Sequence, residues 1–123
     1  MLISMLKSKL HGATVTGCAL DYEGSITVDS TLMKAVKLLP HEKVLVANLR
    51  NGNRFETYAI PAPAGSGEVC LNGAAALLGK PGDRVILLSF ALMSPRSAAR
   101  HEPNVVVLDG HNRPAKRKAV HSK

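Results

Sequence analysis

Aromatic side chains are nearly missing from this sequence of 123 residues, which has two tyrosines, two phenylalanines and no tryptophan. Proteins that bind single-stranded nucleic acid stack bases on aromatic rings, so this scarcity argues against such a function. Cysteine is scarce too. Cys18 and Cys70 lie far apart with no metal ligand beside them, which argues against a disulfide framework and a zinc site. We expect two buried apolar thiols and no metal.

Long apolar runs are also absent from the sequence. No segment approaches the run of about 18 apolar residues that a membrane-spanning helix needs. Ser4, Lys7 and Lys9 interrupt the amino terminus, where a secretory signal requires an unbroken apolar stretch. We therefore expect a soluble cytoplasmic protein, and the length predicts a single domain.

Basic charge is in excess, with a formal net charge of +7, but it is unevenly distributed. Residues 113–123 carry five basic groups and no acid, which leaves +2 on the rest of the chain. A segment of this composition is typically solvated. We predict a folded domain over residues 1–110 and a basic, disordered tail over residues 111–123. A small barrel that binds RNA or DNA through this tail is the alternative function, and such binding would weaken steeply with added salt.

Turn residues divide most of the sequence into short alternating segments, a pattern that predicts a mainly β fold. Two strands are expected in the first part of the chain, with turns at Gly12 and Gly17. Asp29 or Ser30 can cap a short amphipathic helix that closes at Pro40.

Asn51-Gly52 stands between the strand-like segments 43–50 and 53–60, which is the strongest local signal for a β-hairpin. Both central residues of such a turn are expected to have positive φ. Many short strands favour a small closed barrel, because closure removes exposed sheet edges. The remaining elements expected are strands at 68–71, 84–92 and 105–108 and a helical piece within 72–78.

Four short motifs stand in order along the chain. They are Lys9-Leu10-His11, Tyr22-Glu23-Gly24-Ser25, Asn51-Gly52-x-Arg54-Phe55-x-Thr57-Tyr58 and Asn72-Gly73-Ala74-Ala75-Ala76. Taken singly, Gly24-Ser25 and Asn72-Gly73 are ordinary turn sequences. With all four motifs in this order and spacing, the chain resembles the pyruvoyl-dependent aspartate decarboxylases over roughly residues 1–110.

The resemblance implies a six-stranded double-psi β-barrel with short helices, assembled as a homotetramer with active sites between subunits. It implies decarboxylation of L-aspartate to β-alanine and CO2, which supplies pantothenate synthesis. The proenzyme cuts itself between Gly24 and Ser25, giving chains 1–24 and 25–123. Ser25 becomes a covalent pyruvoyl group, the only cofactor implied. The need for a separate maturation protein is left open.

The chemistry of the cut follows from the bonds involved. The Ser25 hydroxyl attacks the carbonyl carbon of Gly24, where no Cβ crowds the approaching oxygen. By resemblance, Thr57 donates a hydrogen bond to the oxyanion that forms. The finished pyruvoyl group then forms a Schiff base with aspartate and accepts the electrons that CO2 leaves behind. By resemblance, Tyr58 is the proton donor that completes the reaction.

Aspartate carries two carboxylates that cationic side chains can bind. Arg54 offers a planar fork and Lys9 a compact charge, and either residue can bind either carboxylate. By resemblance, the other substrate contacts and pocket-lining residues are Thr57, the backbone of Gly73, Ala74 and Ala75, and the side chains of His11, Tyr22 and Asn72.

Strand geometry complicates this predicted site. Side chains alternate along a strand, so Arg54 and Tyr58 share one face while Thr57 lies on the other. A twist or bulge at the end of the strand could bring the two faces to one pocket. An interface to which two subunits each contribute a face would do the same, and the resemblance favours the interface.

The other histidines match no motif and form no metal geometry, so we assign them no role. They are His41, His101, His111 and His121. A third hypothesis is an inactive homologue that keeps the barrel as a structural partner. The joint presence of Ser25, Thr57 and Tyr58 argues against it.

Overall fold

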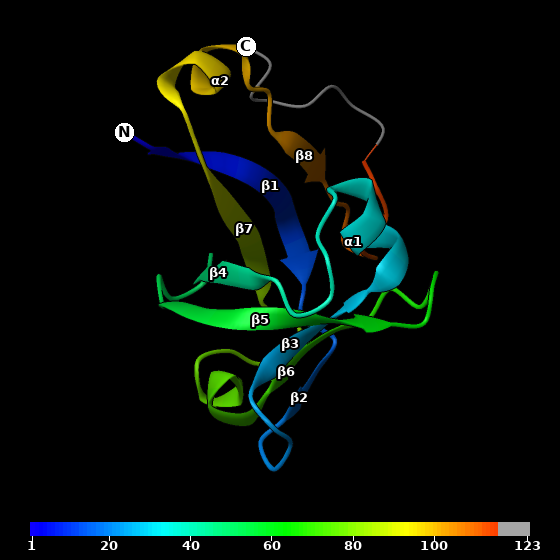
Figure 1. Ribbon diagram of the computed structural model, residues 1–123. Helices are drawn as coiled ribbons and strands as arrows, with labels where there is room; N and C mark the ends of the chain where they lie inside the picture. The colour runs from blue at the N-terminus through cyan, green and yellow to red at the C-terminus, as the bar shows by residue number, and fades with distance from the viewer. Residues whose placement is uncertain (116–123) are drawn as a thin grey trace.

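The computed structural model describes residues 1–115 as a mainly β fold (Figure 1), which confirms the predicted fold class. Eight strands form one sheet in the order β2-β6-β3-β5-β4-β7-β1-β8, two more strands than the resemblance implied. The two ends of this order are short strands, β2 and β8. The strands are β1 (Ile3–Thr14), β2 (Gly17–Ala19), β3 (Ser25–Asp29), β4 (Lys43–Asn48), β5 (Arg54–Ala62), β6 (Val69–Asn72), β7 (Arg84–Met93) and β8 (Asn104–Val107).

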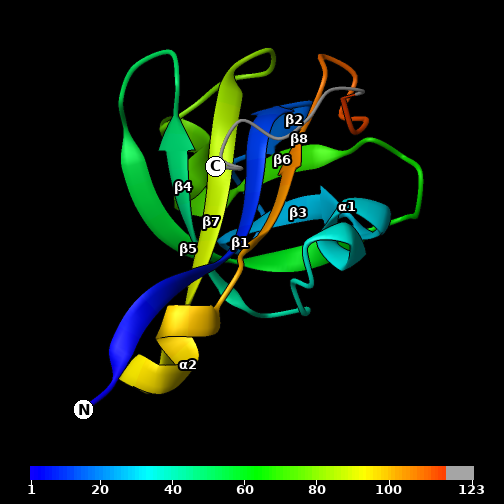
Figure 2. The ribbon, with the colours of Figure 1, turned by 90° about the horizontal axis from the view of Figure 1, so that it is seen from above.

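One hydrophobic core lies on the inner face of the curved sheet (Figure 2). Burial alternates along β7, where every second side chain from Val85 to Ser89 is buried, as the pleat of a strand requires. Leu10, Val46 and Leu87 are completely or almost completely buried at the centre. Each such side chain contributes about 2 kcal/mol of transfer free energy.

Three short helical segments accompany the sheet. The helix α1 (Ser30–Ala35) follows β3 and buries Leu32 and Met33 against the core. As predicted, Asp29 caps it, accepting a hydrogen bond of 2.8 Å from the Thr31 N–H. The helix ends earlier than expected because Lys37 has a φ of 62°. The 3-10 helix η1 (Gly73–Leu77) confirms the helical piece predicted within 72–78. The helix α2 (Pro95–Arg100) was not predicted from the sequence.

Gly12 lies inside the long strand β1, where the sequence had predicted a turn. The pairing of β1 with β7 shifts between His11 and Ala13, which marks a β-bulge. Gly12 has a φ of 82°, and its carbonyl accepts a hydrogen bond of 2.7 Å from Arg84 Nε. The glycine therefore bends β1 without ending it.

The hairpin between β4 and β5 is confirmed, but its turn differs from the prediction. Gly52 has a φ of 77°, whereas Asn51 is not among the residues with positive φ. The loop spans 49–53, closed by a hydrogen bond of 2.8 Å from Asn48 N to Asn53 O. The Asn51 carboxamide accepts from Asn53 N at 2.8 Å and stabilises this wider turn.

The chain continues past β8 along the surface of the domain. Asn112 is buried, and its Nδ2 donates to the carbonyls of Thr14 and Gly67 at 2.9 and 2.8 Å. Residues 111–115, the first part of the predicted tail, thus pack on the domain, and residues 116–123 lie outside the described residues. Within residues 1–115, no helix is both long and apolar enough to cross a membrane.

Candidate active site

The strand β3 brings three of the four motifs together. It begins at Ser25 and lies between β5, to which it is parallel, and β6, to which it is antiparallel. Ser25 is in register with Asn72 on β6, and the next residue, Ile26, is in register with Ala59 on β5. Ala59 directly follows Tyr58. The proposed cleavage point therefore lies between the motif of β5 and the motif that begins at the end of β6.

The hydroxyl of Ser25 is buried and bonded to an amide. Ser25 and Asn72 are only 1% and 2% exposed. The Nδ2 of Asn72 donates to Ser25 Oγ at 2.9 Å and to Thr27 Oγ1 at 2.8 Å. Because Ser25 Oγ accepts this bond, its own proton remains free to leave. The same N–H can stabilise the negative charge that develops on Oγ when that proton leaves.

Gly73 lies directly against the segment that contains Gly24. A Cβ atom on Gly73 would lie 2.7 Å from Gly24 Cα, 2.8 Å from Gly24 N and 2.9 Å from the Tyr22 carbonyl oxygen. Real Cβ atoms do not approach backbone so closely, and Gly73 also has a φ of 66°. Only glycine fits at this position without moving the Gly24-Ser25 peptide. A Cβ on Gly24, in contrast, would meet no atom within 4 Å.

A pocket of ≈ 380 Å³ opens beside this peptide. Six of its lining residues were predicted for the site, and Phe55, Glu56 and Leu78 were not. The six predicted residues are Gly24, Thr57, Tyr58, Asn72, Ala74 and Ala75.

Six predicted residues do not line this pocket, and two of them, Ser25 and Gly73, are direct chain neighbours of the lining residues Gly24 and Asn72. Tyr22 lines a neighbouring pocket together with Thr27, Cys70 and Asn72. Lys9, His11 and Arg54 line neither of the two pockets.

Those last three residues share the outer face of the sheet. Arg54 on β5 and His11 on β1 lie in register, connected across the sheet by one paired residue on β4 and one on β7. Glu56 and Lys9 are connected in the same way. Residues paired across adjacent strands lie on the same face. Three strand spacings, about 14 Å along the sheet, separate Arg54 from His11 within one chain.

Side chains alternate along β5 as predicted, yet Thr57 and Tyr58 both line the same pocket of one chain, which the alternation did not lead us to expect. Thr57 pairs with the buried Val44, and Tyr58 pairs with the exposed Lys43. The pairing of β4 with β5 is regular from Arg54 to Tyr58, without a register shift. The bulge considered for this strand is therefore not present.

Comparison with known proteins agrees with this arrangement. A family model described as Aspartate decarboxylase matches residues 1–115. A protein named Aspartate 1-decarboxylase from Syntrophobacter fumaroxidans is 57% identical over 110 residues, 89% of each chain. Proteins of the same name from Dehalococcoides mccartyi and Bacillus subtilis are 55% and 53% identical, covering 89% and 92% of this chain and 88% and 89% of theirs. The chain belongs to the aspartate decarboxylase family.

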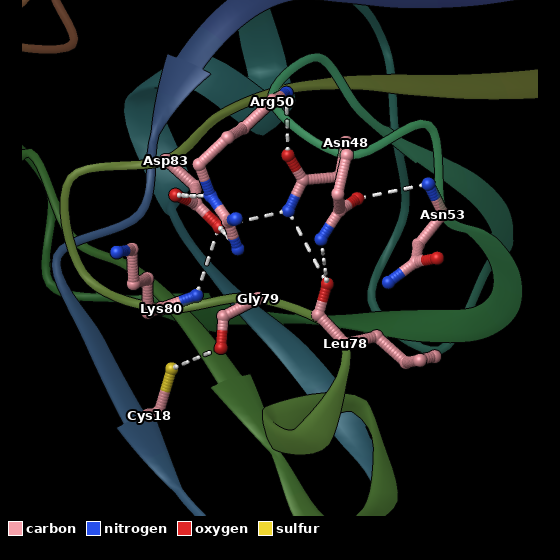
Figure 3. A network of polar contacts seen from close by, with 9 residues as sticks. Cys18, Asn48, Arg50, Asn53, Leu78, Gly79, Lys80 and Asp83 are labelled. Carbon is pink, nitrogen blue, oxygen red and sulfur yellow. Dashed lines mark hydrogen bonds and ion pairs between the residues drawn. The ribbon is translucent and has the colours of Figure 1, made fainter.

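Within this family member, a polar network holds the far end of η1 (Figure 3). Asp83 is 4% exposed and accepts hydrogen bonds from Arg50 Nε at 2.6 Å and from Asn48 Nδ2 at 2.9 Å. The Arg50 guanidinium, supported by Asn48 and the Lys80 N–H, holds the pKa of Asp83 well below its usual range despite burial. Asn48 Nδ2 also lies 3.2 Å from the carbonyl oxygen of Leu78, a pocket residue. Arg50 is thus held by the buried carboxylate of Asp83, whereas Arg54 is an exposed cation on the same hairpin.

Both cysteines differ from the sequence-based expectation of buried thiols. Cys18 is exposed because it lies on the short end strand β2, and its Sγ is 3.6 Å from the Gly79 carbonyl. Cys70 is partly buried on β6, with its Sγ 3.3 Å from Asn72 Oδ1. No group of three or more potential metal ligands occurs among residues 1–115.

Sequence reasoning missed three side chains around the cleavage point. Thr27 and Cys70 each lie two residues from a motif residue on the same strand, so strand alternation could have identified both. The ring of His41 lies 6.1 Å from the ring of Tyr58, centroid to centroid. No local signal linked His41 to Tyr58, because the contact depends on how the chain enters β4.

Proposed function

We propose that this chain is a proenzyme that cuts itself between Gly24 and Ser25, and that the product decarboxylates L-aspartate to β-alanine and CO2. The observation that carries the proposal is the buried Ser25 hydroxyl, bonded to Asn72 and adjacent to a pocket lined by Gly24. The name shared by these relatives, Aspartate 1-decarboxylase, supports the substrate and the reaction. The low aromatic content disfavours the nucleic-acid alternative.

The cut conserves atoms and electrons. Ser25 Oγ attacks the Gly24 carbonyl carbon, the C–N bond breaks, and the amide becomes an ester with a free amino group on Ser25. Loss of the Ser25 α-proton then breaks the Cβ–O bond, and the Gly24 carboxylate leaves with the electron pair. One water converts the resulting dehydroalanine to a pyruvoyl end and releases ammonia. Asn72 donates a hydrogen bond to Ser25 Oγ, and we assign Thr57 as the donor to the oxyanion that forms on the Gly24 carbonyl oxygen.

The surroundings of Ser25 suit a pyruvoyl group, whose oxygens can only accept hydrogen bonds. Asn72 Nδ2 is a donor at this buried position, where it bonds to Ser25 Oγ and to Thr27 Oγ1. The group supplies an electron sink for the loss of the α-carboxylate, and no metal is required for this chemistry. Tyr58, on the pocket wall, is assigned as the proton donor.

The residues assigned to the substrate carboxylates lie on the outer face of the sheet. Neither Arg54 nor Lys9 lines the cleavage pocket of its own chain, and Lys9 on β1 lies three strands away from the strand that carries Arg54. We infer that a second subunit brings its own outer face, which carries Arg54, Lys9 and His11, to this pocket. Tyr22 and the backbone of Gly73 to Ala75 are then at the rim.

An apolar surface on the same outer face supports a homotetramer. Its exposed members include Phe90 and Leu92, which are 50% and 66% exposed, and a patch of this kind favours contact between subunits. The paired strands β4 and β7 contribute Leu45, Ile86, Leu88, Phe90 and Leu92 to this surface.

A direct assay tests the proposed reaction. Purified protein is incubated with L-aspartate, and β-alanine and CO2 are measured by mass spectrometry and by gas release. We expect equal amounts of both products, less product with L-glutamate, and none with Ser25→Ala. Cut protein that leaves aspartate unchanged would refute the assigned substrate. In the cell, the proposed place of this reaction is β-alanine supply for pantothenate in the cytoplasm.

A further inference from the structure

The thiol of Cys70 contacts the amide that holds Ser25. Cys70 precedes Asn72 by two residues on β6, so both side chains lie on one face of the strand. The Sγ atom lies 3.3 Å from Asn72 Oδ1, a suitable distance for an S–H donor. Its other polar contact, with the carbonyl oxygen of Leu71, is longer at 3.9 Å. The amide oxygen of Asn72 is therefore the main acceptor for this thiol.

This contact bears on the direction in which the Asn72 amide points. A carboxamide can be turned by half a rotation, which exchanges its oxygen and its nitrogen. The hydroxyls of Ser25 and Thr27 accept either end, because a hydroxyl both donates and accepts. Sulfur is only a weak acceptor, whereas an S–H group facing Oδ1 completes the hydrogen bonds of the amide. Cys70 thus favours the orientation with Nδ2 toward Ser25 Oγ.

The electrostatic surroundings keep the thiol in its donor form. Partial burial and the charge of Glu68 raise the pKa of Cys70 above its ordinary value. The sulfur therefore keeps its proton at neutral pH. Cys18 is not a disulfide partner in this arrangement: Gly17, not Cys18, is paired with Cys70, and the Cys18 sulfur faces the Gly79 carbonyl.

We propose that Cys70 is a positioning residue for self-cleavage, which orients the Asn72 amide so that its N–H faces the Ser25 hydroxyl. The inference rests on the proposed self-cleavage. It also predicts that maturation is sensitive to thiol reagents, because Cys70 lines the pocket beside Asn72 and is only partly buried. A thiol that carries a disulfide-linked methyl group can no longer donate to Asn72.

The rate of cleavage of newly made full-length chain tests the proposal. The chain is labelled by cell-free translation, synthesis is stopped, and the uncut fraction is followed on denaturing gels. We expect Cys70→Ala to slow cleavage roughly threefold to tenfold, the effect of one lost hydrogen bond. Cys70→Ser keeps a donor and should cleave within about twofold of wild type. Cys18→Ser, at an exposed position, is the matched control.

A chemical measurement covers the case in which Cys70→Ala folds poorly. Uncut Cys18→Ser chain is treated with methyl methanethiosulfonate, which then reacts with Cys70 alone, and afterwards with dithiothreitol. Slow cleavage that recovers after reduction supports the proposal, and cleavage at an unchanged rate after complete modification overturns it. Equal rates for Cys70→Ala and wild type also overturn it. A wild-type chain that never cuts would instead refute the proposed function.

Discussion

A Cβ atom on Gly73 would lie 2.7 Å from the Cα of Gly24, so the start of η1 is packed against the peptide that is proposed to break. This contact joins two motifs that are far apart in the sequence. It gives the glycine of Asn72-Gly73 a role beyond an ordinary turn, because the backbone approach fixes where the Gly24 carbonyl lies relative to Ser25.

The first prediction concerns this glycine. Gly73→Ala should slow self-cleavage more than tenfold, because either η1 or the Gly24 backbone must move. Gly52→Ala is the matched control: Gly52 also has positive φ, at 77°, but a Cβ there would meet no atom within 4 Å. The Gly52→Ala protein should be about 1 kcal/mol less stable than wild type yet should cleave itself at the wild-type rate. Equal cleavage by both variants on a gel time course would show that the close approach is unimportant.

The second prediction concerns the donor at Ser25. Asn72→Asp keeps the shape of the side chain but replaces Nδ2 with an oxygen. Cleavage should slow about 100-fold, as when one preorganised donor is lost at a developing oxyanion. Thr27→Val removes the other hydroxyl that Nδ2 contacts and leaves the bond to Ser25. This control should cut within a few-fold of wild type, whereas parity of Asn72→Asp with wild type would contradict the assigned role.

The third prediction concerns the network at the end of η1. Asp83→Asn should lower the free energy of unfolding by about 2 kcal/mol at neutral pH, because it removes charged hydrogen bonds to Arg50. The pKa of Asp83 is depressed in the folded protein, so its contribution is complete above the unfolded value of about 3.9. The contribution is lost as the pH falls below that value.

Urea unfolding of the two proteins between neutral pH and pH 3 measures this effect. The difference in stability should shrink as the pH is lowered, while exposed Asp21→Asn should differ little from wild type at any pH. A difference that stays constant with pH would show that the charge of Asp83 does not stabilise the fold.

The fourth prediction tests whether active sites are shared between chains. Ser25→Ala and Arg54→Ala should each be inactive alone. When both are produced in one cell, mixed tetramers combine an intact Ser25 from one chain with an intact Arg54 from its neighbour, and about a quarter of the sites should be complete. Activity that stays at the level of the single variants would place both residues in one chain.

Much of this architecture could be predicted from local patterns. Strand alternation, the hairpin at Asn51-Gly52 and the Asp29 cap all follow from short-range rules, and the ordered motifs identified the family. The bulge at Gly12 could not be distinguished from a turn, because both use a glycine with positive φ. The short helix α2 also escaped prediction, since its six residues carry no apolar periodicity.

The site was predictable in composition but not in arrangement. The motifs named Ser25, Asn72 and Thr57, and the pairing of β3 with β5 and β6 brings them together. The position of Lys9, three strands away from the motif on β5, depends on strand order and register. The contact of Cys70 with Asn72 depends on them too. Neither can be read from a single sequence, because pairing between distant strands is a tertiary property.

The most direct test of the account is the intact mass of the purified chain under denaturing conditions, after warm incubation, with Ser25→Ala as the control. We predict two fragments split after Gly24, with the larger one lighter by one ammonia than a chain that begins with serine, and a single uncut chain for Ser25→Ala. A wild-type chain that stays whole, or a larger fragment that still begins with serine, would contradict the proposal that Ser25 becomes a pyruvoyl group.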